Sequence, residues 1–292
     1  MNRCIHCTRC IRFAEEIGGF FDLGTSGRGR GTEINTYVEK MLYSEMSGNL
    51  ADVCPVGALN NGPFAYKARP FELLSKPTID LMDSLGSNTE VDFKKYTRMI
   101  MRVQPRVHEA INEEWLSDKS RQAFDGLKRQ RVLTPLLRKG ENFVEYAWED
   151  ALSIIAQRVN NVEGHEISAG IGEFESIENI QSFKDFLNSL NCYNYEFRRS
   201  NFLSVGNNFR TDYIFNSQIE SIEDSDLILL VGVNPRTEAP VLNSRILKAV
   251  SKKRSKVYTI GTPSDLTYEY EHLGNTAKTI NELLEGTHEA CE

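Results

Sequence analysis

Four cysteines constrain this chain more than any other feature of its sequence. Cys4, Cys7 and Cys10 form a C-x-x-C-x-x-C run, and Cys54, followed at once by Pro55, lies far downstream. Thiolates two residues apart wrap one corner of a cubane cluster, and a distant Cys-Pro supplies the fourth ligand. The pattern therefore predicts one [4Fe–4S] cluster held by Cys4, Cys7, Cys10 and Cys54.

Two other uses of cysteine fit less well. Structural zinc sites usually take their cysteines as two C-x-x-C-like pairs, whereas this chain has one triplet and one singlet. Disulfide frameworks belong to small secreted chains, and this chain has six cysteines in 292 residues. Zinc therefore stays as the alternative, which iron and sulfide analysis separates from the cluster. His6 is expected to point outward, because four thiolates complete the set.

The two remaining cysteines are isolated. Cys192 follows an apolar helical run and is expected to be a buried structural thiol, and Cys291 is expected to be exposed. Two unpaired thiols beside an iron–sulfur motif favour a reducing compartment.

Composition excludes some classes of partner. The formal net charge is −7 and the pI is near 5.5, which argues against a nucleic-acid-binding surface. No apolar run approaches the roughly 20 residues of a membrane span. Cys4 stands almost at the start of the sequence, where a cluster ligand would be exposed to fraying and water. We therefore expect another polypeptide to cover this end.

The apolar patterning predicts three domains. Residues 1–72 are expected to form an α+β iron–sulfur cluster domain, and residues 73–134 a small β-rich domain without a cluster. Residues 135–292 alternate helices with apolar strands, which predicts an α/β doubly wound, Rossmann-like parallel sheet. The predicted helices span 11–17, 112–131, 148–159, 177–190, 240–250 and 279–284, and the predicted strands span 78–82, 99–103, 167–171, 226–232 and 257–260.

Two loops look like ligand-binding loops without their fingerprints. The run 27–31 alternates glycine and arginine but lacks the P-loop Lys-Ser/Thr, so we expect a solvated loop. The loop Val233–Pro240 follows a predicted parallel strand at its carboxyl end, the usual ligand position in such folds. No G-x-G-x-x-G is present, so packing against a neighbouring segment is slightly favoured over nucleotide or pterin-phosphate binding.

Longer motifs give the chain a specific resemblance that covers nearly all of it. These motifs are 1–13, Thr36-Tyr37-Val38-Glu39-Lys40-Met41, Ser47-Gly48-Asn49, Cys54–Leu59, Ile111-Asn112-Glu113-Glu114-Trp115, 124–131 and Val233–Pro240. Together they resemble the large iron–sulfur subunit of mitochondrial respiratory complex I. That is the peripheral-arm subunit of NADH:ubiquinone oxidoreductase that is related to molybdopterin oxidoreductases.

The resemblance implies a function in electron transfer. One [4Fe–4S] cluster would relay single electrons between NADH oxidation and quinone reduction, and the chain alone would hold no complete active site. It implies a place in the peripheral arm on the matrix side of the mitochondrial inner membrane, beside NADH-binding flavoprotein subunits. Arg3, Arg9 and Arg12 would favour the reduced cluster if they face it. The alternative is a fragment of a molybdopterin-dependent oxidoreductase such as formate dehydrogenase.

Departures from the family pattern add further expectations. The family's subunit begins with a [2Fe–2S] domain and a His-Cys₃ cluster segment and continues beyond the point matching Glu292, so we expect an internal slice or a split-gene product. Some relatives have a further [4Fe–4S] site in the small β domain, where Ser117 stands at the last ligand position here. We therefore expect no metal in 73–134 and no pterin in 135–292.

A separate chain carrying the [2Fe–2S] and His-Cys₃ clusters is expected to pack against residues 1–72. Four apolar side chains are candidates for the core of that interface, with ordinary burial inside the cluster domain as the equal alternative for each: Ile5, Phe13, Phe20 and Phe21.

Overall fold

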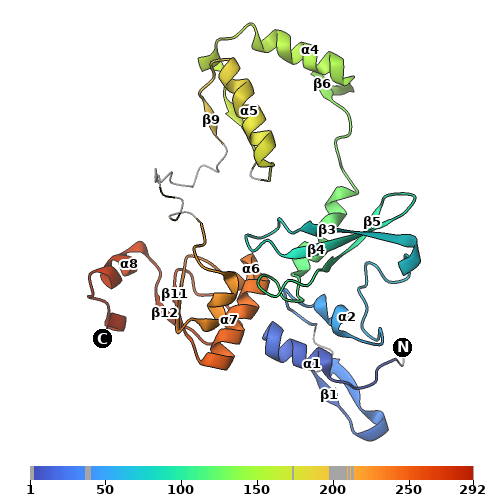
Figure 1. The fold of residues 1–292 in the computed structure, drawn as a ribbon, viewed down its shortest axis with the longest axis vertical. Coiled ribbons are helices and arrows are strands. Elements are labelled where there is room, and N and C mark those ends of the chain that lie inside the picture. Colours follow the sequence, from blue (N-terminus) through green and yellow to red (C-terminus); the bar gives the residue numbers. More distant parts are fainter. Residues whose placement is uncertain are drawn as a thin grey trace. The chain divides into compact units, whose positions relative to one another are not determined.

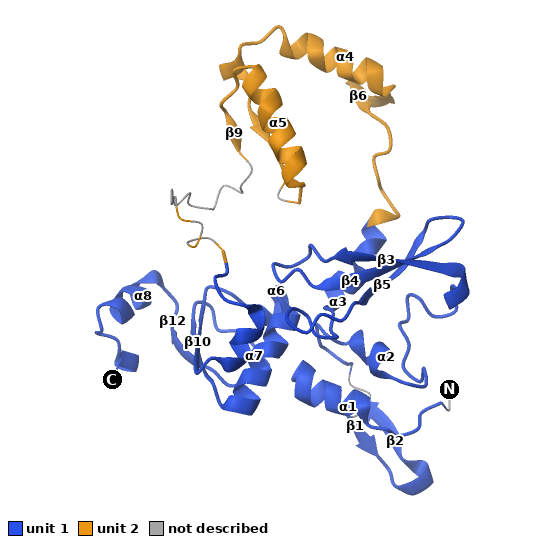
Figure 2. Cartoon of the chain, in the orientation of Figure 1, with its two compact units in different colours: residues 1–126, 215–292 blue, residues 127–214 orange. Residues whose placement is uncertain are grey.

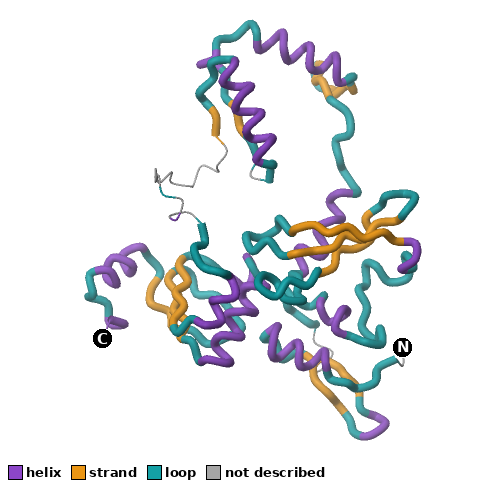
Figure 3. Tube along the Cα trace, in the orientation of Figure 1, coloured by secondary structure: helices purple, strands orange, loops and turns teal. Residues whose placement is uncertain are grey.

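The computed structural model describes residues 3–36, 41–172, 174–196, 209, 211 and 214–291. Residues 37–40, which carry part of one family-like motif, lie outside the described residues. The chain divides into two compact units, residues 1–126 with 215–292 and residues 127–214 (Figure 2). Both units mix helices with small sheets, which confirms the mixed α and β class (Figure 3). The predicted division of the sequence into three domains stays a prediction.

The larger unit contains three small sheets (Figure 1). An antiparallel hairpin is formed by β1 (Leu23–Ser26) and β2 (Glu33–Thr36), and an antiparallel sheet by β3 (Leu73–Ile79), β4 (Asn88–Lys94) and β5 (Ile100–Pro105). A parallel sheet is formed by β10 (Leu227–Val231), β11 (Lys256–Ile260) and β12 (Glu271–Gly274). The helices are α1 (Arg9–Phe13), α2 (Asn49–Val53), α3 (Asp118–Gln122), α6 (Pro235–Glu238), α7 (Pro240–Lys253) and α8 (Ala277–Leu284).

The start of the chain folds around one short helix. Helix α1 continues into a π-helical turn, Ala14–Gly18, which ends at Gly19 in the left-handed conformation. The predicted helix over 11–17 is therefore confirmed. Phe13 packs against Trp115, with ring centroids 4.8 Å apart.

The four candidates for an interface core divide into two pairs. Phe13 and Phe20 are only 4% and 7% exposed, so they belong to the core of this unit and not to an outer surface. Ile5 and Phe21 are 61% and 78% exposed and remain candidates.

The helix predicted over 112–131 is wrong in length. Asn112 turns its side chain onto backbone groups, accepting from the N–H of Asn88 and donating to the carbonyl of Arg106. Ser117 then caps a new helix by accepting from the N–H of Ser120. Both side chains compete with helical hydrogen bonds. The helix begins only at Asp118 and is followed by a tighter turn, Ala123–Leu127.

Helix α7 explains why residues 215–292 belong to the same unit as the first 126. Its Ile246 and Leu247 pack with Leu230 and Val257 beneath the parallel sheet. Its Val241 packs in the core that contains Phe13. The predicted strands 226–232 and 257–260 and the predicted helix 240–250 are confirmed with small changes in their bounds.

The smaller unit consists of short elements. Strands β6 (Leu136–Lys139) and β7 (Asn142–Glu145) form a hairpin that the sequence did not predict. Helix α4 (Trp148–Val159) has the predicted bounds, and α5 (Ile177–Ser189) ends one residue early. Strand β8 (Ala169–Gly170) is shorter than predicted and pairs in parallel with β9 (Tyr195–Glu196). None of the helices in the described part of the chain is long and apolar enough to cross a membrane.

Candidate iron–sulfur cluster site

The structure brings the four predicted site cysteines together. Cys4, Cys7, Cys10 and Cys54 all line one cavity of about 660 Å³, whose other walls come from the β1–β2 hairpin and the turn after Cys54. Cys10 is buried, Cys7 and Cys54 are half-buried, and Cys4 is exposed. Among the described residues, no three acidic, cysteine or histidine side chains converge on a point that would hold one metal ion. The role of the four cysteines as ligands stays a prediction.

The first three cysteines are held by a backbone that turns twice through the left-handed region. His6 has φ 52° and Thr8 has φ 60°, values that are uncommon for residues other than glycine. Such conformations cost about 1–3 kcal/mol each and persist where surrounding structure enforces them. The turn at His6 directs its backbone N–H to Sγ of Cys4 at 3.4 Å. The segment therefore offers hydrogen-bond donors to sulfur, as a cluster-binding loop requires.

The fourth cysteine follows helix α2 and opens a tight turn. Cys54 donates its N–H to the carbonyl of Leu50, and Gly57 takes φ 63°, which glycine adopts without strain. The N–H of Leu59 reaches Sγ of Cys54 at 3.5 Å, and Asn60 fastens the turn by donating to the carbonyl of Gly57.

These backbone donors change the acidity of Cys54. Burial raises the pKa of its thiol, but the N–H groups of Leu59, Val56, Ala58 and Gly57 outweigh burial, so the pKa lies below its ordinary value. The thiolate is the form that binds metal. The turn is therefore built to hold a negatively charged sulfur.

Cys10 has the opposite character. Burial raises the pKa of its thiol, and the charges of Cys7 and Cys4 raise it further, against the N–H of Ile11, which lowers it. A bound cation would offset this cost of ionising Cys10. The donor set, the sulfur-directed N–H groups and the cavity thus fit an iron–sulfur cluster.

Charged side chains on the cavity wall differ in part from those expected. Arg9 lies on the wall, but the cavity is not lined by Arg3 or Arg12. Arg30, from the run predicted to be a solvated loop, also lies on the wall. The alternation of glycine and arginine in 27–31 was the available signal.

Helix α2 is anchored by a polar network that sequence reasoning missed. Asn49 is fully buried and its amide makes four hydrogen bonds, to Met46 O at 2.9 Å, to Leu116 O at 2.8 Å, from Leu116 N at 3.0 Å and from Arg121 Nη2 at 3.1 Å. Arg121 also pairs with Asp52 at 2.6 Å. The β-rich region thereby fixes the helix that leads to Cys54. The motif Ser47-Gly48-Asn49 was the only sign of it in the sequence.

Comparisons with known proteins agree with this geometry. A protein-family model described as molybdopterin oxidoreductase matches residues 131–292, more than half of the chain. The chain belongs to the molybdopterin oxidoreductase family. Residues 1–60 match the ferredoxin-like domain of NADH-quinone oxidoreductase subunit 3, and residues 74–125 match the NADH-ubiquinone oxidoreductase NDSU1/NuoG-like 4Fe-4S domain.

Similar curated proteins point to one branch of this family. The chain is 45% identical over 289 residues to the mitochondrial "NADH dehydrogenase [ubiquinone] iron-sulfur protein 1" of Solanum tuberosum, covering 99% of this chain and 39% of that protein. It is 45% identical to the 78 kDa subunit of NADH-ubiquinone oxidoreductase of Candida albicans, covering 98% and 40%. For the 75 kDa subunit of Reclinomonas americana the identity is 43%, covering 100% and 44%. The resemblance to the large iron–sulfur subunit is confirmed, and the chain spans about two fifths of these relatives.

In this chain, residues 74–125 match a domain named for a 4Fe-4S cluster, yet they contain no cysteine. Ser117, at the expected ligand position, caps α3 and shares a hydrogen bond of 2.7 Å with Ser120. Ser120 in turn donates to Asp80. A buried polar network occupies this position, and the absence of metal from 73–134 stays a prediction.

The loop Val233–Pro240 is occupied by contacts within its own unit. It forms the short helix α6, and Arg236 pairs with Glu45 at 2.9 Å and with Asp265 at 2.6 Å. Burial lowers the pKa of Arg236, but its hydrogen bonds to the two carboxylates raise it above the ordinary value. These contacts agree with packing, the use that the sequence slightly favours.

The two cysteines outside the motif behave as predicted. Cys192 is fully buried and donates to the carbonyl of Ile167 at 3.3 Å, and Cys291 is exposed.

Proposed function

We propose that Cys4, Cys7, Cys10 and Cys54 hold one [4Fe–4S] cluster and that the chain serves in electron transfer. The observation that carries the proposal is the single cavity lined by all four cysteines, with backbone N–H groups directed at Cys4 and Cys54. Its support from the comparisons is the pair of matches to ferredoxin-like and 4Fe-4S domains.

The residues around the cavity have distinct parts in this proposal. A bound cluster supplies one-electron chemistry, at a potential between about −700 and +450 mV by cluster type. The N–H groups at Cys4 and Cys54 stabilise negative charge on sulfur, and Arg9 and Arg30 on the wall favour the added electron. Phe13 and Leu50, in the core next to Cys10, keep water from that side of the site.

We further propose that the chain is part of NADH:ubiquinone oxidoreductase, in the peripheral arm on the matrix side of the mitochondrial inner membrane. The names of the relatives support this place, as does the predicted order of a cluster domain, a β-rich domain and a doubly wound α/β domain. The parallel β10–β11–β12 sheet with α7 packed on it supports the last of these. Its partners would be NADH-binding flavoprotein subunits and a chain with the [2Fe–2S] and His-Cys₃ clusters, which would cover Ile5 and Phe21. Nucleic acid is not a proposed partner.

The ligand set is tested by replacing one cysteine. Cys54→Ala should abolish the electron paramagnetic resonance signal of the reduced cluster and lower the iron and sulfide content. Cys291→Ala, at an exposed thiol outside the cavity, is the matched control and should retain both. Unchanged iron content in Cys54→Ala would show that the ligand set is wrong, and zinc in place of iron would show that the site is structural.

The match to molybdopterin oxidoreductases favours a second candidate, a pterin-dependent enzyme. The matched region contains Cys291, the second-to-last residue of the sequence, and Cys192. Cys192 is fully buried, and its thiol donates to a carbonyl. It is thus poorly placed to bind molybdenum. Molybdenum or tungsten in the purified protein, bound in stoichiometric amount, would favour the pterin enzyme over electron transfer alone.

A further inference from the structure

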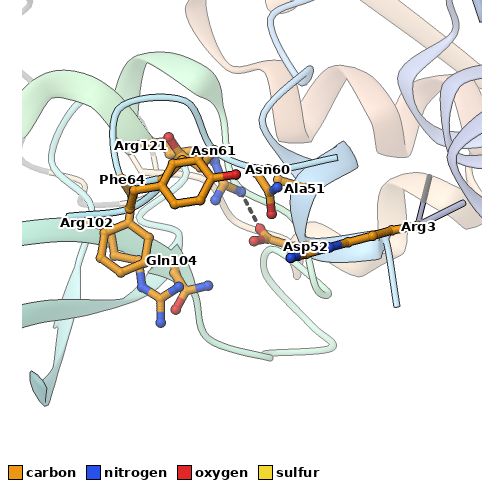
Figure 4. A pocket seen from close by; sticks show the side chains of 11 residues that line it. Arg3, Ala51, Asp52, Asn60, Asn61, Phe64, Arg102, Gln104 and Arg121 are labelled. Carbon is orange, nitrogen blue, oxygen red and sulfur yellow. Dashed lines mark hydrogen bonds and ion pairs between the residues drawn. The ribbon is translucent and has the colours of Figure 1, made fainter. Parts of the chain in front are cut away.

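A second pocket is lined by residues that neighbour the proposed cluster ligands in sequence. It has a volume of about 390 Å³ and is lined by residues of the N-terminal segment, α2, the turn 60–66, β5 and α3. Arg3 stands next to Cys4 in the sequence, and Asp52 stands two positions before Cys54. The pocket therefore contacts the two segments that carry proposed ligands, the N-terminal segment with Cys4 and the α2 segment that leads to Cys54. These two segments are called the arms of the site. Figure 4 shows Arg3 and Asp52 on one side of it, with Phe64, Arg102 and Gln104 on the other.

The charge of this pocket is positive. Three guanidinium groups, Arg3, Arg102 and Arg121, and one carboxylate, Asp52, belong to its lining. Asp52 is engaged by the buried Arg121 at 2.6 Å. Arg3 forms no ion pair with any residue that the structure describes. Arg102 is likewise paired, with Asp92 at 2.6 Å, so the uncompensated positive charge is that of Arg3. In a partly enclosed site such a charge acts more strongly than on an open surface.

One of the arginines is held rigidly in place. Nε of Arg102 donates to Asp92 at 2.6 Å, and the guanidinium lies over the ring of Phe64, with Cζ 4.4 Å from its centroid. A guanidinium fixed by a carboxylate and an aromatic ring loses little entropy when it binds an anion. Three side-chain amides, Asn60, Asn61 and Gln104, add neutral hydrogen-bonding groups to the wall.

We propose that this pocket binds a small oxyanion of the phosphate class. Arginine forks match the oxygens of such anions, and the amides supply further donors. The chain as a whole carries a net charge of −7, so the pocket is a local exception to an acidic protein. On the proposed function, a bound oxyanion would join Arg3, beside Cys4, to the amide of Asn60, which fastens the turn after Cys54. It would then restrain the two arms that hold the cluster.

The test uses inorganic phosphate as the probe and the full chain as the sample. Isothermal titration at constant ionic strength should give saturable binding at millimolar phosphate. Arg3→Gln and Gln104→Leu should each weaken binding, Arg3→Gln by about tenfold, the size of one charge-assisted hydrogen bond. Arg28→Gln is the matched control, because Arg28 is an exposed arginine outside the lining of the pocket, and it should bind as the unchanged chain does.

Several outcomes would overturn the proposal that this pocket binds an oxyanion. No saturable binding to the unchanged chain would do so, as would an affinity in both Arg3→Gln and Gln104→Leu that equals that of the unchanged chain. An equal loss in Arg28→Gln would show that phosphate responds to surface charge alone. Binding is measured on the chain with and without its iron, so a failure of the cluster proposal leaves this measurement readable.

The link to the cluster has its own measurement. Phosphate should slow the loss of the visible cluster absorbance to an iron chelator in the unchanged chain and in Arg28→Gln, but not in Arg3→Gln. Equal protection in all three would overturn the restraint of the two arms.

Discussion

Nη2 of Arg121 donates to Oδ1 of Asn49 at 3.1 Å, across 72 positions of the sequence. This bond joins the β-rich region to the helix that ends at the fourth cysteine. Asn49 uses every hydrogen-bonding position of its amide, and Arg121 is only 1% exposed. A region without cysteines therefore has a clear part in the proposed cluster site, because it fixes helix α2.

Replacing Asn49 tests this anchor. Asn49→Ala would leave the buried N–H and carbonyl groups of Leu116 and one bond of Arg121 without partners, whereas the carbonyl of Met46 keeps the backbone N–H of residue 49. The free energy of unfolding should fall by about 3 kcal/mol, the range for buried polar groups left unsatisfied. Denaturant titration measures it. Asn281→Ala, at an exposed position of α8, is the control and should cost nothing. Equal stability of the two variants would contradict the anchor.

Gly48 makes room for the same arginine. A Cβ at this position would lie 2.6 Å from Cδ and Nε of Arg121 and 2.7 Å from Oδ1 of Asp118. Its φ is −61°, so the backbone itself would accept alanine and the conflict is steric. Gly48→Ala should therefore lower the free energy of unfolding by about 1–3 kcal/mol, the cost of overpacking.

Gly62→Ala is the matched control for that prediction. A Cβ at Gly62 meets nothing within 4 Å, so stability should be unchanged or slightly higher. If Gly48→Ala unfolded at the same denaturant concentration as Gly62→Ala, Arg121 would have to be free to move, and the anchor would be loose.

Much of the fold follows from local pattern. The run Trp148–Val159 has apolar residues at helical spacing and forms α4 with those bounds. The apolar strand β10, which ends at Val231, pairs in parallel with β11, which ends at Ile260, as continuous apolar runs predict. Cys4, Cys7, Cys10 and Cys54 line one cavity, although Cys54 is remote in sequence.

Other features depend on contacts that spacing does not carry. Asn112 and Ser117 sit in a polar stretch with helical character, but their side chains bond to backbone groups and postpone the helix. Strand β4 buries polar residues such as Thr89 and Asp92, which a hydrophobic pattern does not reveal. Asn49 and Arg121 read as ordinary polar residues until the fold brings them together.

Two neighbouring tyrosines should respond oppositely to loss of the hydroxyl. Oη of Tyr268 is buried without a partner among the described residues, whereas Oη of Tyr270 donates to Ser264 O at 2.7 Å. Tyr268→Phe should leave the free energy of unfolding unchanged or raise it by up to about 1 kcal/mol, and Tyr270→Phe should lower it by about 1 kcal/mol. Thermal unfolding of the two variants side by side checks this. The same loss in both would mean that Tyr268 has a partner.

The dependence of stability on alkaline pH tests the burial of the Tyr268 hydroxyl independently. Burial raises the pKa of its phenol, so above about pH 10 the unfolded chain loses this proton while the folded chain keeps it. The unfolded state then binds fewer protons, and stability falls as pH rises. The Tyr268→Phe variant should show a shallower fall. Identical profiles would contradict the burial of the hydroxyl.

Removing the charge of Asp83 should raise the free energy of unfolding. Burial raises the pKa of its carboxyl, and the charge of Asp80 raises it further; Oδ2 is buried without a partner among the described residues, while Oδ1 accepts from Leu85 N at 3.1 Å. Between its unfolded pKa near 3.9 and the higher folded pKa, the folded chain binds more protons, so stability falls as pH rises through this window. Asp83→Asn keeps the acceptor and cannot ionise. It should therefore be more stable than the unchanged chain at pH 7, with the advantage shrinking as pH falls toward about 4.

Urea titrations of the metal-free chain across this pH range measure the difference in stability between Asp83→Asn and the unchanged chain. The control is Asp226→Asn, at an exposed carboxylate, which should show no difference. A variant at Asp83 that is less stable than the unchanged chain at pH 7 would mean that the carboxylate has a cationic partner in the folded protein.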